Sequence, residues 1–449
     1  MNQNLSEKAK GWYLQNIDIL SKRLNGSSKN LLSELREKSK KKFLELDFPN
    51  RKNEEWRFTD VTPILKHNFI PSILIDKTKF TPEEIKKYLF TGFDFYLLTF
   101  INGIFEEDLS DLKNLPNGLI AGSLNKILKD KPELIHDNID KFSVEQNIFN
   151  ALNSIYAYDG FVIIADKNVV LDKPVQILFL NGNNENEVLA SPKNLIIANN
   201  NSQLSVIVNY KGFGDKNYFM NSTVDVFIGE SALIDYYKIQ DENDDSFHIE
   251  KIYAVQNSKS IFNQFNISFG GSLVRNDINS KLDGEFTETH YYGLYLAQDN
   301  QHVSNYTFID HAKPNCMSNE LYKGILDDNS HGVFNGKIFV RPGAQKTNAY
   351  QQNKAILLSK DAKINTKPQL EIFADDVKCT HGAAVGHLDE EAEFYIRSRG
   401  VPQELAKSIL IRAFAYDVIE SMKIEELKEQ INHRIFERLH RVEFQNNLS

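Results

Sequence analysis

The stretch Val224-Asp225-Val226-Phe227-Ile228-Gly229-Glu230-Ser231-Ala232-Leu233 decides the fold class. Its first half is rich in β-branched and aromatic residues, as strands are, and its second half breaks at a glycine before the next apolar run begins. Two other breaks have the same form, Asn200-Asn201-Ser202-Gln203-Leu204 and Asn257-Ser258-Lys259-Ser260-Ile261. Corners that repeat in this way favour a β-solenoid, in which each coil stacks on the one before, over a sandwich or a barrel.

Short strand-like runs continue from about Asp159 to Val385, with no helical period between them. This excludes a doubly wound α/β fold. We predict a mainly β protein with three parts: an N-terminal helical or mixed domain at 1–150, a solenoid core at 151–385 and a C-terminal helical domain at 386–449. We expect an inward row of aliphatic side chains in the core. The open ends of the coil would be sheet edges that need a cap or a partner.

Helical periodicity marks both ends of the chain. From Ser6 to about Phe48 it predicts a helical hairpin, broken at Asn25-Gly26-Ser27-Ser28. After Val385, Asp389 is placed as an N-cap, Gly400 as a helix end and Pro402 as the next start. We expect this tail to dock on this chain or on another protein. Its predicted apolar faces are Leu405, Ile409, Ala413, Phe414 and Val418, then Ile424, Leu427, Ile431 and Leu439.

The composition narrows the class of protein. The 449 residues carry a net charge of -9, which argues against a nucleic-acid-binding protein. The two cysteines, Cys316 and Cys379, make a disulfide framework improbable and fit a reducing compartment. No run approaches the roughly 18 apolar residues of a membrane span, and no signal sequence follows Met1. We therefore expect a cytoplasmic protein.

Several apparent catalytic motifs fail on inspection. Gly332-Val333-Phe334-Asn335-Gly336-Lys337-Ile338 resembles a P-loop, but its spacing is one residue short and Ile338 stands where a hydroxyl is required. No Gly-x-Ser-x-Gly elbow occurs. The acidic run Asp241 to Asp245 lacks the spacing of an EF-hand and reads as a solvated loop. We expect neither ATP hydrolysis nor serine chemistry from this chain.

Two other groups of residues are better explained by packing. Asp310-His311 with nearby Cys316 could ligate iron or zinc, but a hydrogen-bonded core histidine is the better interpretation. In Asn53-Glu54-Glu55-Trp56-Arg57-Phe58-Thr59-Asp60, a packed tryptophan with charged neighbours is favoured over a ligand site.

Cys379 and His381 are the candidates for chemistry that remain. On a strand, residues two apart project from the same face, so the thiol and the imidazole would point together. The alternative is a buried small residue beside a hydrogen-bonded histidine. Two ligands cannot complete a metal site, so any functional version needs further ligands, for which a second subunit is the natural source.

The same region resembles a known family. The block Lys367-Pro368-Gln369-Leu370-Glu371-Ile372-Phe373-Ala374-Asp375-Asp376-Val377-Lys378-Cys379-Thr380-His381-Gly382-Ala383, followed by Phe394-Tyr395-Ile396-Arg397-Ser398-Arg399-Gly400, is similar to the C-terminal signature of the SufB/SufD family of iron-sulfur cluster assembly proteins. The likeness extends to Glu54–Asp60, Tyr322–Leu326, Phe334–Ile338 and Gln345–Thr347. Leu370 stands where SufB proteins typically carry a cysteine, so the resemblance is to the SufD branch.

This resemblance implies a right-handed parallel β-helix that pairs with a SufB-like paralogue through its end. His381 and Cys379 would then lie at the interface, beside a transient iron-sulfur cluster or iron. The C-terminal helices would receive the ATPase SufC, with the following residues as the expected contacts: Arg397, Arg399, Gly400, Val401, Pro402 and Phe414. The chain itself would be a non-catalytic scaffold. Whether reduced flavin binds the complex is left open.

Two alternatives from other classes remain. A β-helix carbohydrate-active enzyme would need paired carboxylates on an exposed groove, and the charged residues of the strand region lie mostly in turns. A self-associating structural protein is the other, because the edge that receives a paralogue could also form a homodimer.

Overall fold

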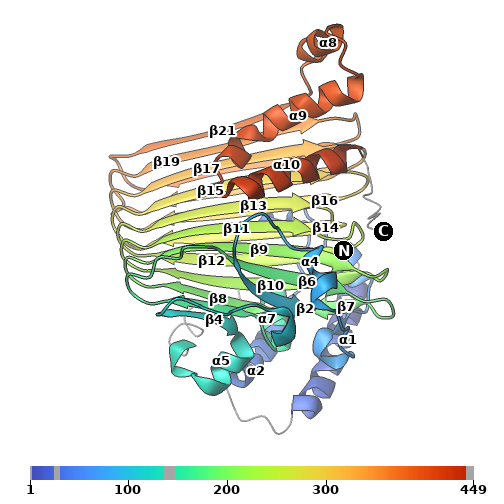
Figure 1. The fold of residues 1–449 in the computed structure, drawn as a ribbon, viewed down its shortest axis with the longest axis vertical. Coiled ribbons are helices and arrows are strands. Elements are labelled where there is room, and N and C mark those ends of the chain that lie inside the picture. Colours follow the sequence, from blue (N-terminus) through green and yellow to red (C-terminus); the bar gives the residue numbers. More distant parts are fainter. Residues whose placement is uncertain (1–2, 25–30, 136–146, 441–449) are drawn as a thin grey trace.

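Two long parallel sheets, stacked coil upon coil, form the body of the protein (Figure 1). The computed structural model describes residues 3–24, 31–135 and 147–440. The first sheet runs in the order β20 (Lys363–Ile372), β18 (His331–Val340), β16 (His302–His311), β14 (Leu273–Leu282), β12 (Phe247–Gln256), β10 (Tyr218–Ile228), β8 (Lys193–Ala198), β5 (Phe161–Ala165) and β4 (Leu119–Ser123), with β7 (Val188–Ala190) and β1 (Ile70–Pro71) beside it.

The second sheet runs parallel to the first through the same coils. Its order is β21 (Lys378–Gly386), β19 (Asn348–Leu357), β17 (Met317–Leu326), β15 (Glu288–Ala297), β13 (Ile261–Phe269), β11 (Leu233–Asp241), β9 (Gln203–Phe213), β6 (Val175–Gly182), β2 (Tyr96–Ile101) and β3 (Ile104–Phe105). Among the described residues, only the pairs β2–β3 and β4–β5 are antiparallel. The predicted mainly β fold with a solenoid core is confirmed; its handedness stays a prediction.

The three predicted corners are real turns, and they stack. Asn201, Ser231 and Lys259 each adopt a positive φ near 60°, which reverses the chain between the sheets. Each donates its backbone N–H to the next coil: Asn201 to the carbonyl of Glu230 at 2.9 Å, Ser231 to Ser258 at 2.9 Å and Lys259 to Glu285 at 2.8 Å. The residue after each corner is small and buried, and this column consists of Ser202, Ala232, Ser260, Thr287, Cys316 and Thr347. The corner therefore fixes both the turn and the spacing of the coils.

The predicted inner row of aliphatic side chains is present in the early coils, for example Ile163, Ile177 and Ile196, but aromatic rings lie beside it and polar side chains interrupt it in the later coils. Near the N-terminal end the rings of Phe100, Phe179 and Tyr210 stack at 4.9 and 5.0 Å. One inward column then reads, in register along the second sheet, Val206, Tyr236, Gln264, Tyr291, Glu320, Gln351 and His381. Polar side chains are tolerated inside because coils in register bring hydrogen-bonding partners together.

Helices lie at both ends of the solenoid (Figure 1). At the N-terminal end are α1 (Gln3–Leu24), α2 (Leu31–Glu45), α3 (Thr62–Leu65), α4 (Pro82–Lys86), α5 (Leu124–Asp130) and α7 (Ile148–Tyr156), with short 3₁₀ turns η1 (Glu54–Trp56), η2 (Ser72–Leu74) and η3 (Glu107–Leu109). Helices α1 and α2 confirm the predicted helical segments, while the break at Asn25-Gly26-Ser27-Ser28 lies outside the described residues.

Trp56 confirms the packing interpretation of its segment. It is 4% exposed and stacks on Phe149 of α7, with ring centroids 5.4 Å apart. The guanidinium of Arg275 on β14 lies 3.8 Å from the Trp56 ring centroid and donates to the carbonyl of Glu55 at 2.9 Å. The segment is thereby held against the outer face of the first sheet.

The C-terminal helices are α8 (Glu390–Ser398), α9 (Gln403–Glu420) and α10 (Glu425–His440). The predicted caps are confirmed: Asp389 accepts from the N–H groups of Glu391 and Ala392, and Gly400 has a φ of +86°. The later part of α9 and the inner face of α10 cover the outer face of the second sheet, where Leu427 and Ile431 are fully buried. None of the described helices has an apolar run long enough for a bilayer.

The predicted apolar face of α9 is correct only in its second half. Val418 is buried and Phe414 half-buried, but Ala413 is exposed, and Leu405 and Ile409 are each 43% exposed. The buried side of α9 is displaced from the predicted face, since Ile411 and Ala415 are buried while Ile409 and Ala413 are exposed. The beginning of α9 also extends past the last coil (Figure 1).

We predict that Gly324→Ala destabilises the protein by about 1–3 kcal/mol, because it overpacks the solenoid interior. A Cβ at this position would lie 2.5 Å from the ring of Tyr295 on the neighbouring strand. Gly343→Ala is the matched control, since a Cβ there meets nothing within 4 Å. Equilibrium unfolding in urea measures both variants, and equal stability would contradict this account of the inner packing.

Candidate functional site

The C-terminal rim of the solenoid is an open end. Strands β20 and β21 are the last of their sheets, and within the described part of the chain no strand pairs with their outer edges. Three apolar side chains are exposed on this coil: Ile372 at 39%, Phe373 at 58% and Val385 at 48%. Unpaired edges and exposed apolar groups together are typical of a surface that another chain covers.

Cys379 and His381 lie on the inward side of β21, at this rim. Cys379 stands in register with Ala349 and packs with Leu370 in one small apolar cluster. His381 stands in register with Gln351, one coil below. The thiol is half-buried and the imidazole is exposed, so the structure brings the two predicted residues to one face without sealing either inside the fold.

Burial raises the pKa of the Cys379 thiol, and the N–H of Ala349 acts only weakly against this. The neutral thiol is therefore the form that this chain favours on its own. A metal or a cation supplied at the rim would be needed to hold the thiolate.

Beneath His381, the inner column continues as buried polar side chains. Gln351 donates to the Glu320 carboxylate at 2.6 Å, and both residues are completely buried. Burial raises the pKa of Glu320 to about 7, against the hydrogen bond from Gln351. The rim therefore rests on a polar interior that contains an ionisable acid.

A second buried ionisable cluster lies deeper in the solenoid. Lys238 forms an ion pair with Glu250 at 2.8 Å and donates to Asn276 at 2.6 Å. Asn276 in turn donates to Asn305 at 2.9 Å. Glu242 lies 2.7 Å from His248 in the same cluster, and burial raises the pKa of Glu242 to about 8. These groups satisfy one another rather than facing solvent.

The described residues contain no group of three or more His, Cys, Asp or Glu side chains placed to hold a metal ion. Asp310 and His311 diverge: Arg341 binds Asp310 through two contacts of 2.8 and 2.7 Å, while His311 faces inward to Ser318 at 2.9 Å. Cys316 occupies the small buried column of the corners. The interpretation of His311 as a hydrogen-bonded core histidine is confirmed.

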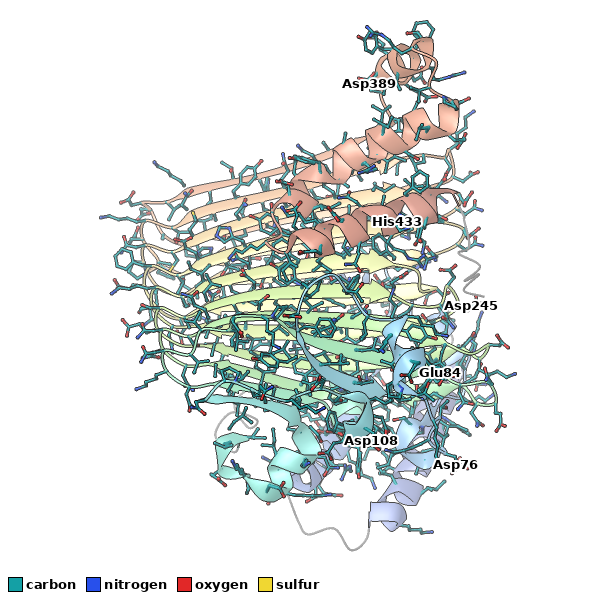
Figure 2. The ribbon with its side chains drawn as sticks, viewed as in Figure 1. Asp76, Glu84, Asp108, Asp245, Asp389 and His433 are labelled. Carbon is teal, nitrogen blue, oxygen red and sulfur yellow. The ribbon has the colours of Figure 1, made fainter. Side chains whose placement is uncertain are left out.

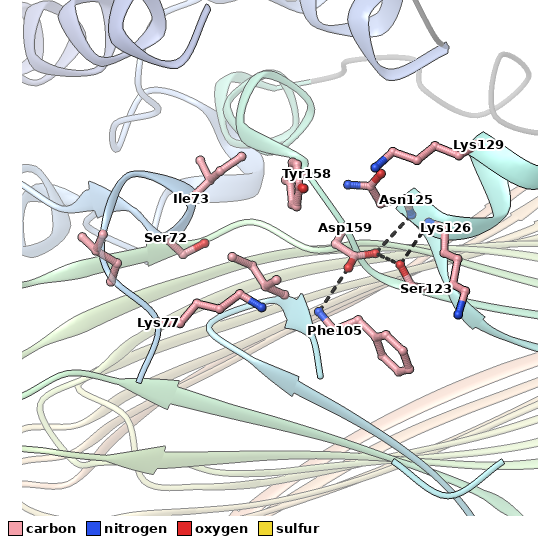
Figure 3. A pocket seen from close by; sticks show the side chains of 12 residues that line it. Ser72, Ile73, Lys77, Phe105, Ser123, Asn125, Lys126, Lys129, Tyr158 and Asp159 are labelled. Carbon is pink, nitrogen blue, oxygen red and sulfur yellow. Dashed lines mark hydrogen bonds between the residues drawn. The ribbon is translucent and has the colours of Figure 1, made fainter. Parts of the chain in front are cut away.

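A pocket at the N-terminal end surrounds Asp159 (Figure 3). This buried carboxylate accepts hydrogen bonds from the Ser123 hydroxyl and from the N–H groups of Phe105 and Asn125. Two of the lysines that line the pocket, Lys77 and Lys126, pair with glutamates outside it. Asp159 thus ties β3 of the second sheet to β4 of the first sheet and to α5.

Comparison with known proteins identifies the family. A family profile described as the SUF system FeS cluster assembly, SufBD core domain, matches residues 179–414, and one described as the SufBD protein N-terminal region matches residues 7–177. The chain belongs to the SufBD family. This membership agrees with the iron-sulfur assembly function that the resemblance implied, and it gives no support to a carbohydrate-active enzyme.

Individual relatives agree. An iron-sulfur cluster assembly SufBD family protein of Synechocystis is 28% identical over 86% of each chain. The iron-sulfur cluster assembly protein SufD of Escherichia coli is 28% identical over 88% of this chain and 90% of its own length. SufD of Bacillus subtilis is 25% identical over 69% of this chain and 74% of its own length. The chain is a SufD homologue.

The residues expected to contact the ATPase do not form one continuous patch. Arg397 lies 3.7 Å from Glu393 within α8, and Arg399, the residue that follows α8, donates to the Tyr395 hydroxyl at 2.7 Å. Gly400, Val401 and Pro402 form the link to α9. Phe414 is half-buried, and its carbonyl accepts from Lys323 of β17 at 2.6 Å. Phe414 therefore belongs to the attachment of α9 to the solenoid.

Sequence reasoning missed two features of this tail. Phe394 and Tyr395 on α8 are 74% and 59% exposed, and no residue of α8 is buried. Asp389 marks the start of this helix, which stands away from the body (Figure 2). The sequence carried one signal of this exposed surface, a pair of aromatic residues on a short helix that has no other element to pack against. The buried contact of Lys323 was also missed, because a lysine in a strand of alternating pattern is expected to face solvent.

We predict that Glu320→Gln makes the protein more stable at pH 8 than the natural chain. The pKa of Glu320 is raised in the fold, so its stabilising contribution is complete below the unfolded pKa near 4.3 and is lost as pH rises towards about 7. The loss is up to about 1.4 kcal/mol per pH unit. Thermal unfolding from pH 5 to 8 measures it, with Glu285→Gln, which does not lie in the buried core, as control. A parallel pH dependence in both variants would contradict the prediction.

Proposed function

We propose that this chain acts in the cytoplasm as a non-catalytic scaffold subunit of a SufB-SufC-SufD type complex for iron-sulfur cluster assembly. It pairs with a SufB-like paralogue through the rim of the solenoid and receives a SufC-like ATPase at α8 and the beginning of α9. The observation that carries the proposal is the open rim, where two unpaired strand edges lie beside an incomplete set of ligands.

The rim supports pairing with a chain of the same architecture. A paralogous solenoid that ends in two equivalent strands could continue both sheets across the interface, with backbone hydrogen bonds satisfying the edges of β20 and β21. The same edge would pair with a second copy of this chain when the paralogue is absent. A homodimer is therefore the expected state in isolation.

His381 and Cys379 would face the nascent cluster or its iron at this interface. An exposed imidazole can bind iron or hydrogen-bond a sulfur species, and the paralogue would supply the remaining ligands. Leu370 lies in the same cluster as Cys379 and offers no thiol, so this side of the interface contributes few donors. The proposal assigns no residue of this chain to a reduced flavin.

The helical tail supports the second partner. Exposed Phe394 and Tyr395, beyond the last coil, provide an aromatic surface with no cover among the described residues. ATP hydrolysis is assigned to that partner, because Gly332 to Lys337 lie within the extended strand β18 and not in a phosphate-binding loop. Movement of the ATPase would reach the solenoid through Lys323, which contacts both Phe414 and Asp417 of α9.

We expect two single substitutions to separate the partners. Val385→Asp should abolish co-purification with the SufB-like paralogue and retain the SufC-like ATPase, because it buries a charge in the strand interface. Phe394→Asp should abolish co-purification with the SufC-like ATPase and retain the SufB-like paralogue. Val170→Asp is the control, since Val170 is 57% exposed on a different strand connection. Retention of both partners by both test variants would refute the assigned surfaces.

We expect His381→Ala in the reconstituted complex to reduce cluster formation by at least about tenfold while the complex still assembles, because the exposed ring makes no packing contact in the core. Cluster absorbance after anaerobic reconstitution is the measurement. Thr380→Ala, exposed on the outward side of the same strand, is the matched control. Unchanged absorbance in His381→Ala would remove the role of this imidazole.

A further inference from the structure

A pocket of about 550 Å³ lies where the Arg51 to Pro63 segment crosses the outer face of the first sheet. Its walls come from this segment and from the starts of three neighbouring strands, β14, β16 and β18. It is remote in sequence from the rim residues, and no role proposed above uses it. A volume of this size is that of a small-molecule site.

The pocket carries two arginines without a carboxylate partner. Arg51 and Arg57 are exposed, and neither forms an ion pair with any described residue. Arg57 lies over the Phe58 ring at 5.6 Å, and Arg51 acts on Asp60 only at longer range. Of the neighbouring acids, Glu54 pairs with Lys367, whereas Asp60 lines the pocket itself and accepts hydrogen bonds from the backbone and hydroxyl of Thr62. Asp60 keeps its negative charge, so the two arginines outnumber the carboxylates of the lining by one. The two guanidiniums are therefore available to a ligand.

The floor of the pocket is formed by two imidazoles. His302 and His331 stand side by side on β16 and β18, with ring centroids 4.8 Å apart. Burial first, then His331 and Arg275, lowers the pKa of His302 to about 3. His302 is therefore a neutral group because of its burial, and the positive charge of the pocket comes from Arg51 and Arg57.

An apolar side completes the pocket. Phe58, Pro63 and Leu273 supply its apolar lining, and the Arg57 guanidinium lies over the Phe58 ring. A bare inorganic ion would leave this surface uncovered, whereas a ligand with both an anionic and an apolar part would contact both sides. The planar guanidinium group matches the oxygen geometry of a phosphate group.

We propose that this pocket binds a small organic phosphate, with its phosphate group between Arg51 and Arg57 and its apolar part against Phe58. The ligand belongs to the class of phosphate monoesters with a flat or aliphatic body. Docked there, it would join the Trp56 segment to β16 and β18 and stiffen the attachment of the N-terminal region to the solenoid.

Calorimetric titration of the full chain tests the proposal with phenyl phosphate and inorganic phosphate as probes. Phenyl phosphate should bind at least about tenfold more tightly than inorganic phosphate, and Arg57→Gln and Arg51→Gln should each weaken it by about tenfold or more. Lys52→Gln removes an exposed cation from the same segment that does not line the pocket, so it should bind as the natural chain does.

Three results would overturn the proposal: no binding of phenyl phosphate, equal affinity for both probes, or an equal loss in Lys52→Gln, which would indicate diffuse attraction only. Because both arginines are exposed, their variants should unfold at the natural temperature, and thermal melts of each variant verify this. If either variant melts at a lower temperature, Phe58→Ala replaces it in the titration. Phe58→Ala should weaken the binding of phenyl phosphate and leave the binding of inorganic phosphate unchanged.

Discussion

The backbone hydrogen bond between stacked corners is the interaction on which the rest of the structure depends. A non-glycine residue with positive φ costs about 1–2 kcal/mol, and the corners repeat this cost at Asn201, Ser231 and Lys259. Each is offset by an N–H that the next coil accepts and by the long parallel strands that follow. Because every coil is stabilised by its neighbour, the last coil lacks half of its partners. An open rim is thus a direct consequence of how the fold is built.

Stacking in register also determines what reaches that rim. An inward position on one strand is inward on every strand of the sheet, so the column that contains Glu320 and Gln351 ends at His381. A histidine there is solvent-exposed only because no further coil covers it. The same residue one coil earlier would be a core residue, as His311 is on the other sheet. The position of His381 in the stack, more than its residue type, makes it a candidate for interface chemistry.

The sequence was sufficient for the fold class because corner residues are local signals. It predicted the turns at Asn201, Ser231 and Lys259, but not the equivalent turn at Phe286, since phenylalanine is no turn residue and only the stacked neighbours hold it at positive φ. Caps at Asp389 and Gly400 were likewise predictable from chemistry within a few residues.

The residues that fill the interior could not be predicted, because polar side chains lie on the inner face of the sheet and apolar side chains on its outer face. On β17 the inward residues include Glu320, while Leu321 and Ile325 point outward beneath α9 and α10. Alternation alone assigns the apolar set to the core and the glutamate to solvent. In the structure the helical tail covers the outer face of the sheet, so the apolar residues lie there and the glutamate lies inside. The tail is far away in the sequence, so no local pattern predicts this contact.

This reversal also explains how α9 is attached to the second sheet. Since the outer face of the second sheet is buried by α9 and α10, Lys323 can be 4% exposed and still reach Asp417 and the Phe414 carbonyl. Its neighbour on that strand, Tyr322, projects inward and packs on Phe334, with ring centroids 5.0 Å apart. A displacement of α9 therefore acts on adjacent residues of one strand, one facing the helix and one facing the polar interior. β17 therefore contacts α9 on its outer side through Lys323 and the packed interior on its inner side through Tyr322.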